Sequence, residues 1–99
     1  MKERRGPLRS ADRRRQELLL SLLRAVREER GLNQEDVADA LNHPQSFVSK
    51  YESGARRLDL LELKDVCDAI GIDLSEFVHR FVRALDRHSG PATKRRLRP

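Results

Sequence analysis

"NQEDVADALNHPQSFVSKYESG", residues 33–54, contains two short helical patterns separated by a turn. Asn33 is a favourable N-cap, and the acidic residues that follow it suit the positive end of a helix. Asn42 and Pro44 interrupt the pattern, because asparagine tolerates the left-handed conformation and proline is well placed at a helix start. Gly54 is a typical helix stop. Two capped helices separated by three residues predict a helix-turn-helix unit.

Three further helices are predicted around this unit. Before it, leucines and a valine spaced three and four residues apart predict a helix that ends near Arg30. After it, Asp59 and Asp73 are each followed three residues later by glutamate, which is the capping-box pattern at the start of a helix. No strand pattern and no internal repeat is present. The sequence therefore predicts an all-α fold of five helices.

Charge is distributed unevenly over the 99 residues, whose net charge is +5. We divide the chain into a basic N-terminal arm at 1–15, a helix-turn-helix domain at 16–85, and a basic disordered tail at 86–99. The arm either extends the first helix or remains separate from it. Basic tails suit a polyanion such as DNA, because neutralised phosphates release counterions. Tails that only keep the protein soluble are the alternative.

Several classes of protein are disfavoured by the sequence. The single cysteine, Cys67, falls on an apolar helix face and indicates a reducing, cytoplasmic location. Arg24 ends the N-terminal apolar run too early for a signal peptide or a membrane span. His43, His79 and His88 have no metal-ligand spacing, and no nucleophile or phosphate-loop motif is present. We therefore expect no enzymatic activity, no metal, no cofactor and no membrane association.

The helix predicted at 45–53 has two chemically different faces. At about 100° per residue, Val48 and Tyr51 fall on the core side and Phe47 lies at the boundary. The opposite face carries Gln45, Ser46, Ser49, Lys50 and Ser53. Glutamine can pair with adenine, lysine can donate to guanine, and serine can bind a base or a phosphate. Alone, this face also fits an ordinary polar surface, but its place in a helix-turn-helix favours reading of the major groove.

A longer segment, "RGLNQEDVADALNHPQSFVSKYESGARRLDLLELKDVCDAIGID" at 30–73, closely resembles the helix-turn-helix domain of the Cro and lambda-repressor type, also called the xenobiotic-response-element (XRE) family. The resemblance covers about residues 18–84. It implies a five-helix, lambda-repressor-like DNA-binding domain whose second and third helices form the helix-turn-helix. Two positions depart from the family pattern: Asn42 stands where glycine is usual, and Pro44 where serine or threonine is usual.

The resemblance also implies contacts to DNA. Gln34, at the start of the second helix, is expected to contact a phosphate with the help of the free amides there. Arg56 and Arg57 are expected to lie along the DNA backbone, and Phe47 either touches a thymine methyl group or covers the edge of the core. The complete predicted DNA-binding set is Gln34, Gln45, Ser46, Phe47, Ser49, Lys50, Arg56 and Arg57.

Two further interactions are expected outside the recognition face. The resemblance implies a structural ion pair between Arg27 and Glu52 that ties the first helix to the third. The fifth helix has a wider apolar stripe than one core-facing helix usually needs, which suggests a homodimer through Phe77, Phe81 and Leu85. Complete burial of this stripe within one chain is the alternative.

These observations predict a small cytoplasmic transcriptional regulator, most simply a repressor, that binds double-stranded DNA in a sequence-specific manner. The helix at 45–53 would lie in the major groove. The alternative function is the antitoxin of a toxin–antitoxin pair. In that case the fifth helix or a tail would hold a protein partner, and DNA binding would be autoregulatory.

Overall fold

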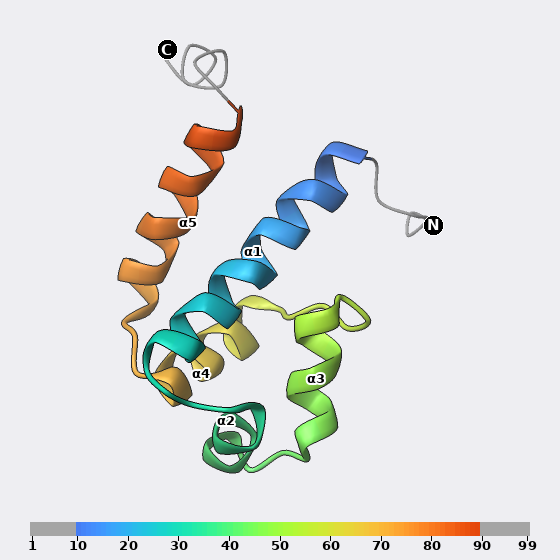
Figure 1. The fold of residues 1–99 in the computed structure, drawn as a ribbon, viewed down its shortest axis with the longest axis vertical. Coiled ribbons are helices and arrows are strands. Elements are labelled where there is room, and N and C mark those ends of the chain that lie inside the picture. Colours follow the sequence, from blue (N-terminus) through green and yellow to red (C-terminus); the bar gives the residue numbers. More distant parts are fainter. Residues whose placement is uncertain (1–9, 90–99) are drawn as a thin grey trace.

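The computed structural model describes residues 10–89, which form five α-helices and contain no strand (Figure 1). The helices are α1 (Ser10–Glu29), α2 (Gln34–Leu41), α3 (Gln45–Ser53), α4 (Leu60–Ile70) and α5 (Leu74–Ser89). The predicted all-α fold is confirmed, with α2 and α3 as the helix-turn-helix. The expectations for residues 1–9 and 90–99, in the two basic tails, lie outside the described residues.

The helix boundaries follow from local capping. The Asn33 side chain accepts from the Asp36 backbone N–H, and the Asp36 carboxylate accepts from the Asn33 backbone N–H, both at 2.8 Å. Asp59 and Glu62 form the same reciprocal pair at the start of α4, at 2.8 and 2.9 Å. In the turn between α2 and α3, Asn42 adopts the left-handed conformation with φ 60°. These contacts satisfy backbone groups that a helix end would otherwise leave unpaired.

Both outer helices extend beyond the domain limits expected from the sequence. α1 begins at Ser10, so residues 10–15 of the basic arm belong to the first helix. α5 continues to Ser89, past Asp86, where the apolar periodicity ends. Polar and basic residues are compatible with an exposed helix, and the helix-breaking Gly-Pro pair of the sequence comes only at 90–91. The expectation of disorder at 86–89 was therefore wrong.

The hydrophobic core lies where α1 packs against α3 and α5, with α2 and α4 closing it (Figure 1). Tyr51 of α3 and Phe77 of α5 are its largest side chains and are fully buried. The Tyr51 hydroxyl has no hydrogen-bond partner among the described residues, so the packing of its ring holds it in place. The proposed dimer contact through Phe77 was wrong, because this ring fills the core of its own chain.

Cys67 is a core residue of α4, and burial raises the pKa of its thiol to about 11. Such a thiol is protonated at neutral pH and therefore unreactive. Among residues 10–89, no group of His, Cys, Asp and Glu side chains is arranged to hold a metal ion. Within the same range, every helix is too short or too polar to cross a bilayer.

Candidate nucleic-acid interface

α3 stands at one side of the molecule and packs against α1 and α2 (Figure 1). Its inner face is anchored by Val48 and Tyr51, which have no exposed surface. Its outer face presents Gln45, Ser46, Lys50 and Ser53 as exposed side chains. Ser49 is half-buried, because it lies at the edge of this polar face. The uncovered face therefore carries amide, hydroxyl and ammonium groups and no carboxylate.

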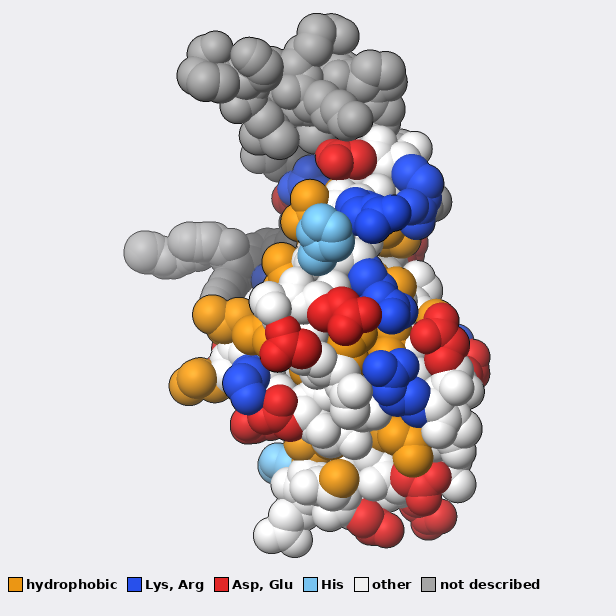
Figure 2. Space-filling view, turned by 90° about the vertical axis from the view of Figure 1, so that its left-hand side faces the viewer, with side chains coloured by type: hydrophobic (Ala, Val, Ile, Leu, Met, Phe, Trp, Pro, Cys, Tyr) orange, Lys and Arg blue, Asp and Glu red, His pale blue; other side chains and the backbone are white. Residues whose placement is uncertain are grey.

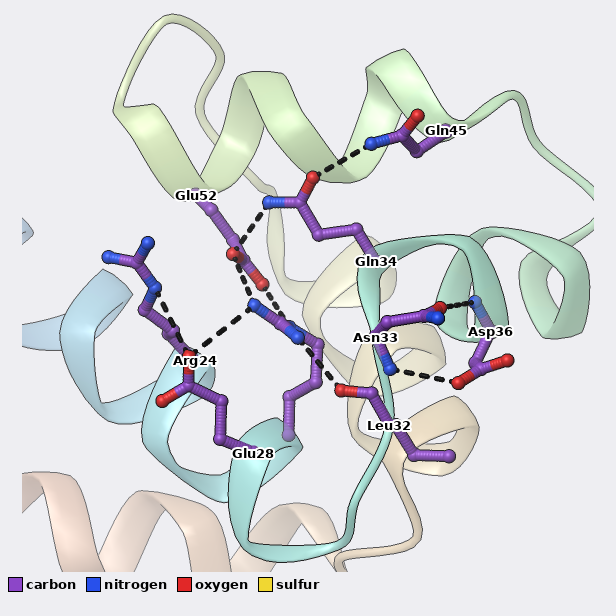
Figure 3. Close-up of polar contacts among 9 residues, drawn as sticks. Arg24, Glu28, Leu32, Asn33, Gln34, Asp36, Gln45 and Glu52 are labelled. Atoms are coloured by element: carbon purple, nitrogen blue, oxygen red, sulfur yellow. Dashed lines mark hydrogen bonds and ion pairs between the residues drawn. The ribbon is translucent and has the colours of Figure 1, made fainter.

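Gln34 connects the starts of α2 and α3 (Figure 3). Its amide nitrogen donates to Glu52 Oε1 at 2.9 Å, and its amide oxygen accepts from Gln45 Nε2 at 3.0 Å. One amide N–H of Gln34 remains for an external acceptor. Sequence reasoning assigned Gln34 to a phosphate and Gln45 to a base, and it missed the hydrogen bond between them. No spacing rule indicates a contact between residues on two different helices.

The ion pair between Arg27 and Glu52 lies directly behind Gln34. Arg27 Nε donates to Glu52 Oε2 at 2.7 Å and Arg27 Nη2 donates to Glu52 Oε1 at 3.0 Å. A third Arg27 donor reaches the Leu32 carbonyl at 2.8 Å. The two side chains are only 8% and 4% exposed. The hydrogen bond to Glu52 raises the pKa of Arg27, and the pair ties α1 to the last turn of α3.

Phe47 is half-buried and surrounded by other ring and cationic groups. The His43 ring stacks on it at a centroid distance of 4.3 Å, and Tyr51 meets it edge-on at 5.6 Å. The Arg56 guanidinium lies 4.7 Å from its centroid, within the range of a cation–π contact. The ring packs against the hydrophobic core. In this structure Phe47 thus covers the edge of the core, which is one of the two roles expected for it.

Arg56 and Arg57 differ in their surroundings. Arg56 makes a two-point hydrogen bond to Glu62, with Nη1 3.1 Å from Oε1 and Nη2 2.7 Å from Oε2. Arg56 thereby braces the loop after α3 against the start of α4. The exposed Arg57 side chain has no acidic partner among the described residues. Of the two arginines, Arg57 is the one whose charge is free for an external phosphate.

The brace between Arg56 and Glu62 predicts a pH effect. The Arg56 hydrogen bond, with a second from the Asp59 backbone N–H, lowers the pKa of Glu62 from 4.5 to about 2. Because the folded-state pKa is lowered, the brace stabilises the fold above pH 4.5 and this contribution is lost as the pH falls toward 2. We expect Arg56→Gln to raise the Glu62 pKa, measured by NMR titration of its carboxyl carbon.

A matched control for this titration is Lys64→Gln, which removes a cation that pairs with Asp68 on the same helix. It should leave the Glu62 pKa where it is. The Asp59 N–H remains in the Arg56→Gln variant, so the pKa should stay below its ordinary value. An unchanged Glu62 pKa in Arg56→Gln would show that the helix cap alone causes the shift.

Two capped helices joined by a tight turn, with the second helix anchored on one face and polar on the other, define a helix-turn-helix DNA-binding domain. A family model described as helix-turn-helix matches residues 23–77, more than half of the chain. An XRE-family-like protein from Pseudomonas syringae pv. tomato is 37% identical, covering 76% of this chain and 92% of that chain with a TM-score of 0.72. The chain belongs to the XRE family of helix-turn-helix proteins.

Two other solved structures share the fold at lower identity. The restriction-modification controller protein C.Esp1396I is 20% identical, covers 70% of this chain and 91% of its own, and has a TM-score of 0.65. The clp gene regulator ClgR from C. glutamicum is 22% identical, covers 81% of this chain and 96% of its own, and has a TM-score of 0.64. Comparison with curated protein sequences finds no significant match.

Proposed function

We propose that this chain is a small transcriptional regulator, most simply a repressor, that reads double-stranded DNA with α3 in the major groove. The observation that best supports this proposal is the outer face of α3, where Gln45, Ser46 and Lys50 are exposed without a neighbouring carboxylate on the helix. The inner face is locked in the core, which holds these side chains in a defined direction. The names of the controller protein and of the clp gene regulator support a regulatory role.

The start of α2 would hold a phosphate of the DNA backbone beside the major groove. A shallow groove of about 470 Å³ opens there, lined by Arg27, Asn33, Gln34, Glu35 and Gln45. Free backbone N–H groups at a helix start and the remaining Gln34 amide hydrogen favour a phosphate oxygen. The Glu35 carboxylate in the same groove would repel a phosphate, so the contact depends on hydrogen bonds more than on net charge. Arg57 would bind the backbone on the other side of α3.

The protein would bind as a homodimer through α5. Val78 and Val82 are 40% and 47% exposed, and Phe81 and Leu85 are half-buried. These four residues follow a spacing of three and four and therefore share one flank of the helix. Figure 2 views the molecule from the α5 side and shows exposed hydrophobic side chains among charged ones. Two-fold symmetry would place the two α3 helices about one turn of DNA apart.

Selection from random duplex DNA tests the reading of bases. We expect the wild-type protein to enrich a roughly palindromic motif. The Gln45→Ala/Ser49→Ala/Lys50→Ala variant should fail to enrich it, because each good base contact contributes about 1–3 kcal/mol of discrimination.

The matched control removes the same residue types elsewhere, as Gln16→Ala/Ser21→Ala/Lys64→Ala. This control should select the same motif as the wild type. Equal enrichment by the α3 variant, or no motif with the wild-type protein, would reject sequence-specific reading by α3.

A further inference from the structure

The region around the recognition helix is itself acidic. Residues 33–73 contain four Lys and Arg against nine Asp and Glu, a net charge of −5. Residues 1–32 contain ten bases and five acids, and residues 74–99 contain seven bases and two acids, so each flank carries +5. DNA binding depends on neutralising phosphates. The cations for this task must therefore come largely from α1, α5 and the segments that adjoin them.

Most cations of the described helices are already neutralised by a neighbouring acid. Pairs include Arg15 with Asp12, Arg24 with Glu28, Arg27 with Glu52, Arg56 with Glu62, Lys64 with Asp68, and Arg80 with Glu76 and Glu29. Five exposed cations have no acidic partner within residues 10–87. Two of them, Lys50 and Arg57, belong to α3 and the loop after it. The other three are Arg14 of α1 and Arg83 and Arg87 of α5.

These three arginines belong to the two helix ends at one end of the molecule. Arg14 lies near the start of α1, and Arg83 and Arg87 lie one turn apart on one flank of α5. Figure 1 shows the start of α1 and the end of α5 at the same end of the long axis, away from α2. The groove of about 610 Å³ beside Arg14 is also lined by Glu17 and Leu85, and Leu85 lies on the opposite side of α5 from Arg83 and Arg87. We call Arg83 and Arg87, which share one face of α5, the basic end.

The two flanks of α5 are chemically distinct. Arg80, Arg83 and Arg87 follow one helical face, whereas Val78 and Val82 lie on another. In Figure 2 Lys and Arg side chains form a column on the face toward the viewer. A dimer through the apolar flank would therefore leave the basic flank uncovered. In the sequence, the adjoining residues 1–9 and 90–99 add eight bases and one acid.

We propose that the basic end is a second phosphate-binding surface, which contacts the DNA backbone independently of the reading of bases by α3. Arginine suits this task, because its planar guanidinium matches the geometry of phosphate oxygens and stays charged. The inference rests on the proposed function, since DNA bound at α3 brings phosphates to the molecule at high local density. The phosphates belong either to the same duplex, beyond the α3 contact, or to a second duplex.

The salt dependence of affinity for a duplex of random sequence tests this proposal. Arg83→Gln/Arg87→Gln should make the slope of log affinity against log salt less negative by about 1.8, which is about 0.9 for each phosphate that the variant no longer neutralises. Between about 50 and 200 mM salt, the variant would lose about 12-fold less affinity than the wild type. Arg24→Gln/Lys64→Gln is the matched control, because it removes the same charge from cations that are already paired.

Two DNA lengths separate the two sources of phosphate. If the duplex held by α3 also reaches the basic end, the change in slope appears with duplexes of about 30 base pairs and not with those of about 12, near one helical turn. If a second duplex is bound, wild-type protein on an immobilised short duplex captures a labelled one, and the Arg83→Gln/Arg87→Gln variant does not.

The proposal is overturned if Arg83→Gln/Arg87→Gln matches the control variant in two measurements: the salt slope at both DNA lengths, and the capture of a second duplex. That outcome is distinguishable from failure of the proposed function, because selection of a motif by α3 does not depend on it. Conversely, a changed salt slope in the Arg83→Gln/Arg87→Gln variant, combined with no motif selected by the wild-type protein, would support phosphate binding by the basic end and reject the reading of bases by α3.

Discussion

Replacing Glu52 with alanine is expected to lower the free energy of unfolding by about 3–5 kcal/mol, because it leaves the buried Arg27 charge without its partner. The Glu52 side chain is 4% exposed and that of Arg27 is 8% exposed. The substitution also removes the acceptor of the Gln34 amide. A domain of this size is typically stable by about 5–15 kcal/mol, so the loss is a large part of the total. Urea unfolding followed by circular dichroism measures it.

A double substitution separates loss of the pair from loss of packing. Arg27→Met/Glu52→Leu replaces both charges with apolar side chains, and it should be clearly more stable than Glu52→Ala. A loss below about 1 kcal/mol for Glu52→Ala would contradict the prediction, since exposed ion pairs contribute amounts of that order. Glu28, whose carboxylate lies 4.0 Å from Arg27 Nη2, would then be the substitute partner to test.

Phe77→Ala is expected to destabilise the fold by a similar amount, about 3–5 kcal/mol, because it opens a cavity where a fully buried ring now packs. Val82→Glu, further along α5, should behave differently. Its side chain is 47% exposed, so the helices should remain folded while the proposed dimer dissociates. Thermal unfolding and sedimentation equilibrium of both variants distinguish the two roles.

The pair of variants also tests the alternative of complete burial. If Val82→Glu lowers the melting temperature as much as Phe77→Ala, the exposed flank of α5 is needed by the core of a single chain. If it changes neither stability nor molecular mass, α5 is not the dimer contact. A Phe77→Ala protein with wild-type stability would contradict the placement of this ring in the core.

Local sequence signals were sufficient for the inner helices. α3 begins after Pro44 and ends before Gly54, as predicted, because proline and glycine restrict or permit backbone angles whatever surrounds them. The starts of α2 and α4 were equally readable, since a capping box joins residues only three positions apart. The family resemblance, the anchored inner face of α3 and the polar residue types on its outer face also follow from the order of residues alone.

The ends of α1 and α5 and the burial of α5 depended on tertiary packing. A polar sequence such as residues 10–15 or 86–89 contains no signal that separates an exposed helix from a tail. The apolar residues of α5 span a wide arc, and only the position of α1 and α4 buries Phe77 and leaves Val78 and Val82 exposed. A helical stripe shows which residues share a face, and the neighbouring helices determine how much of it is covered.

The network behind α3 depended on the tertiary structure as well. Glu52 and Arg27 are 25 positions apart in the chain, and Gln34 and Gln45 are 11 apart, so no local spacing predicts the hydrogen bonds that join them. Arg56 shows the same limit, because the sequence does not indicate whether its guanidinium pairs with a phosphate or with Glu62. Residue types determined what chemistry the surface of α3 can offer. The packing of α1, α2 and α4 around α3 determined which of those groups are already bound within the protein and which remain free for DNA.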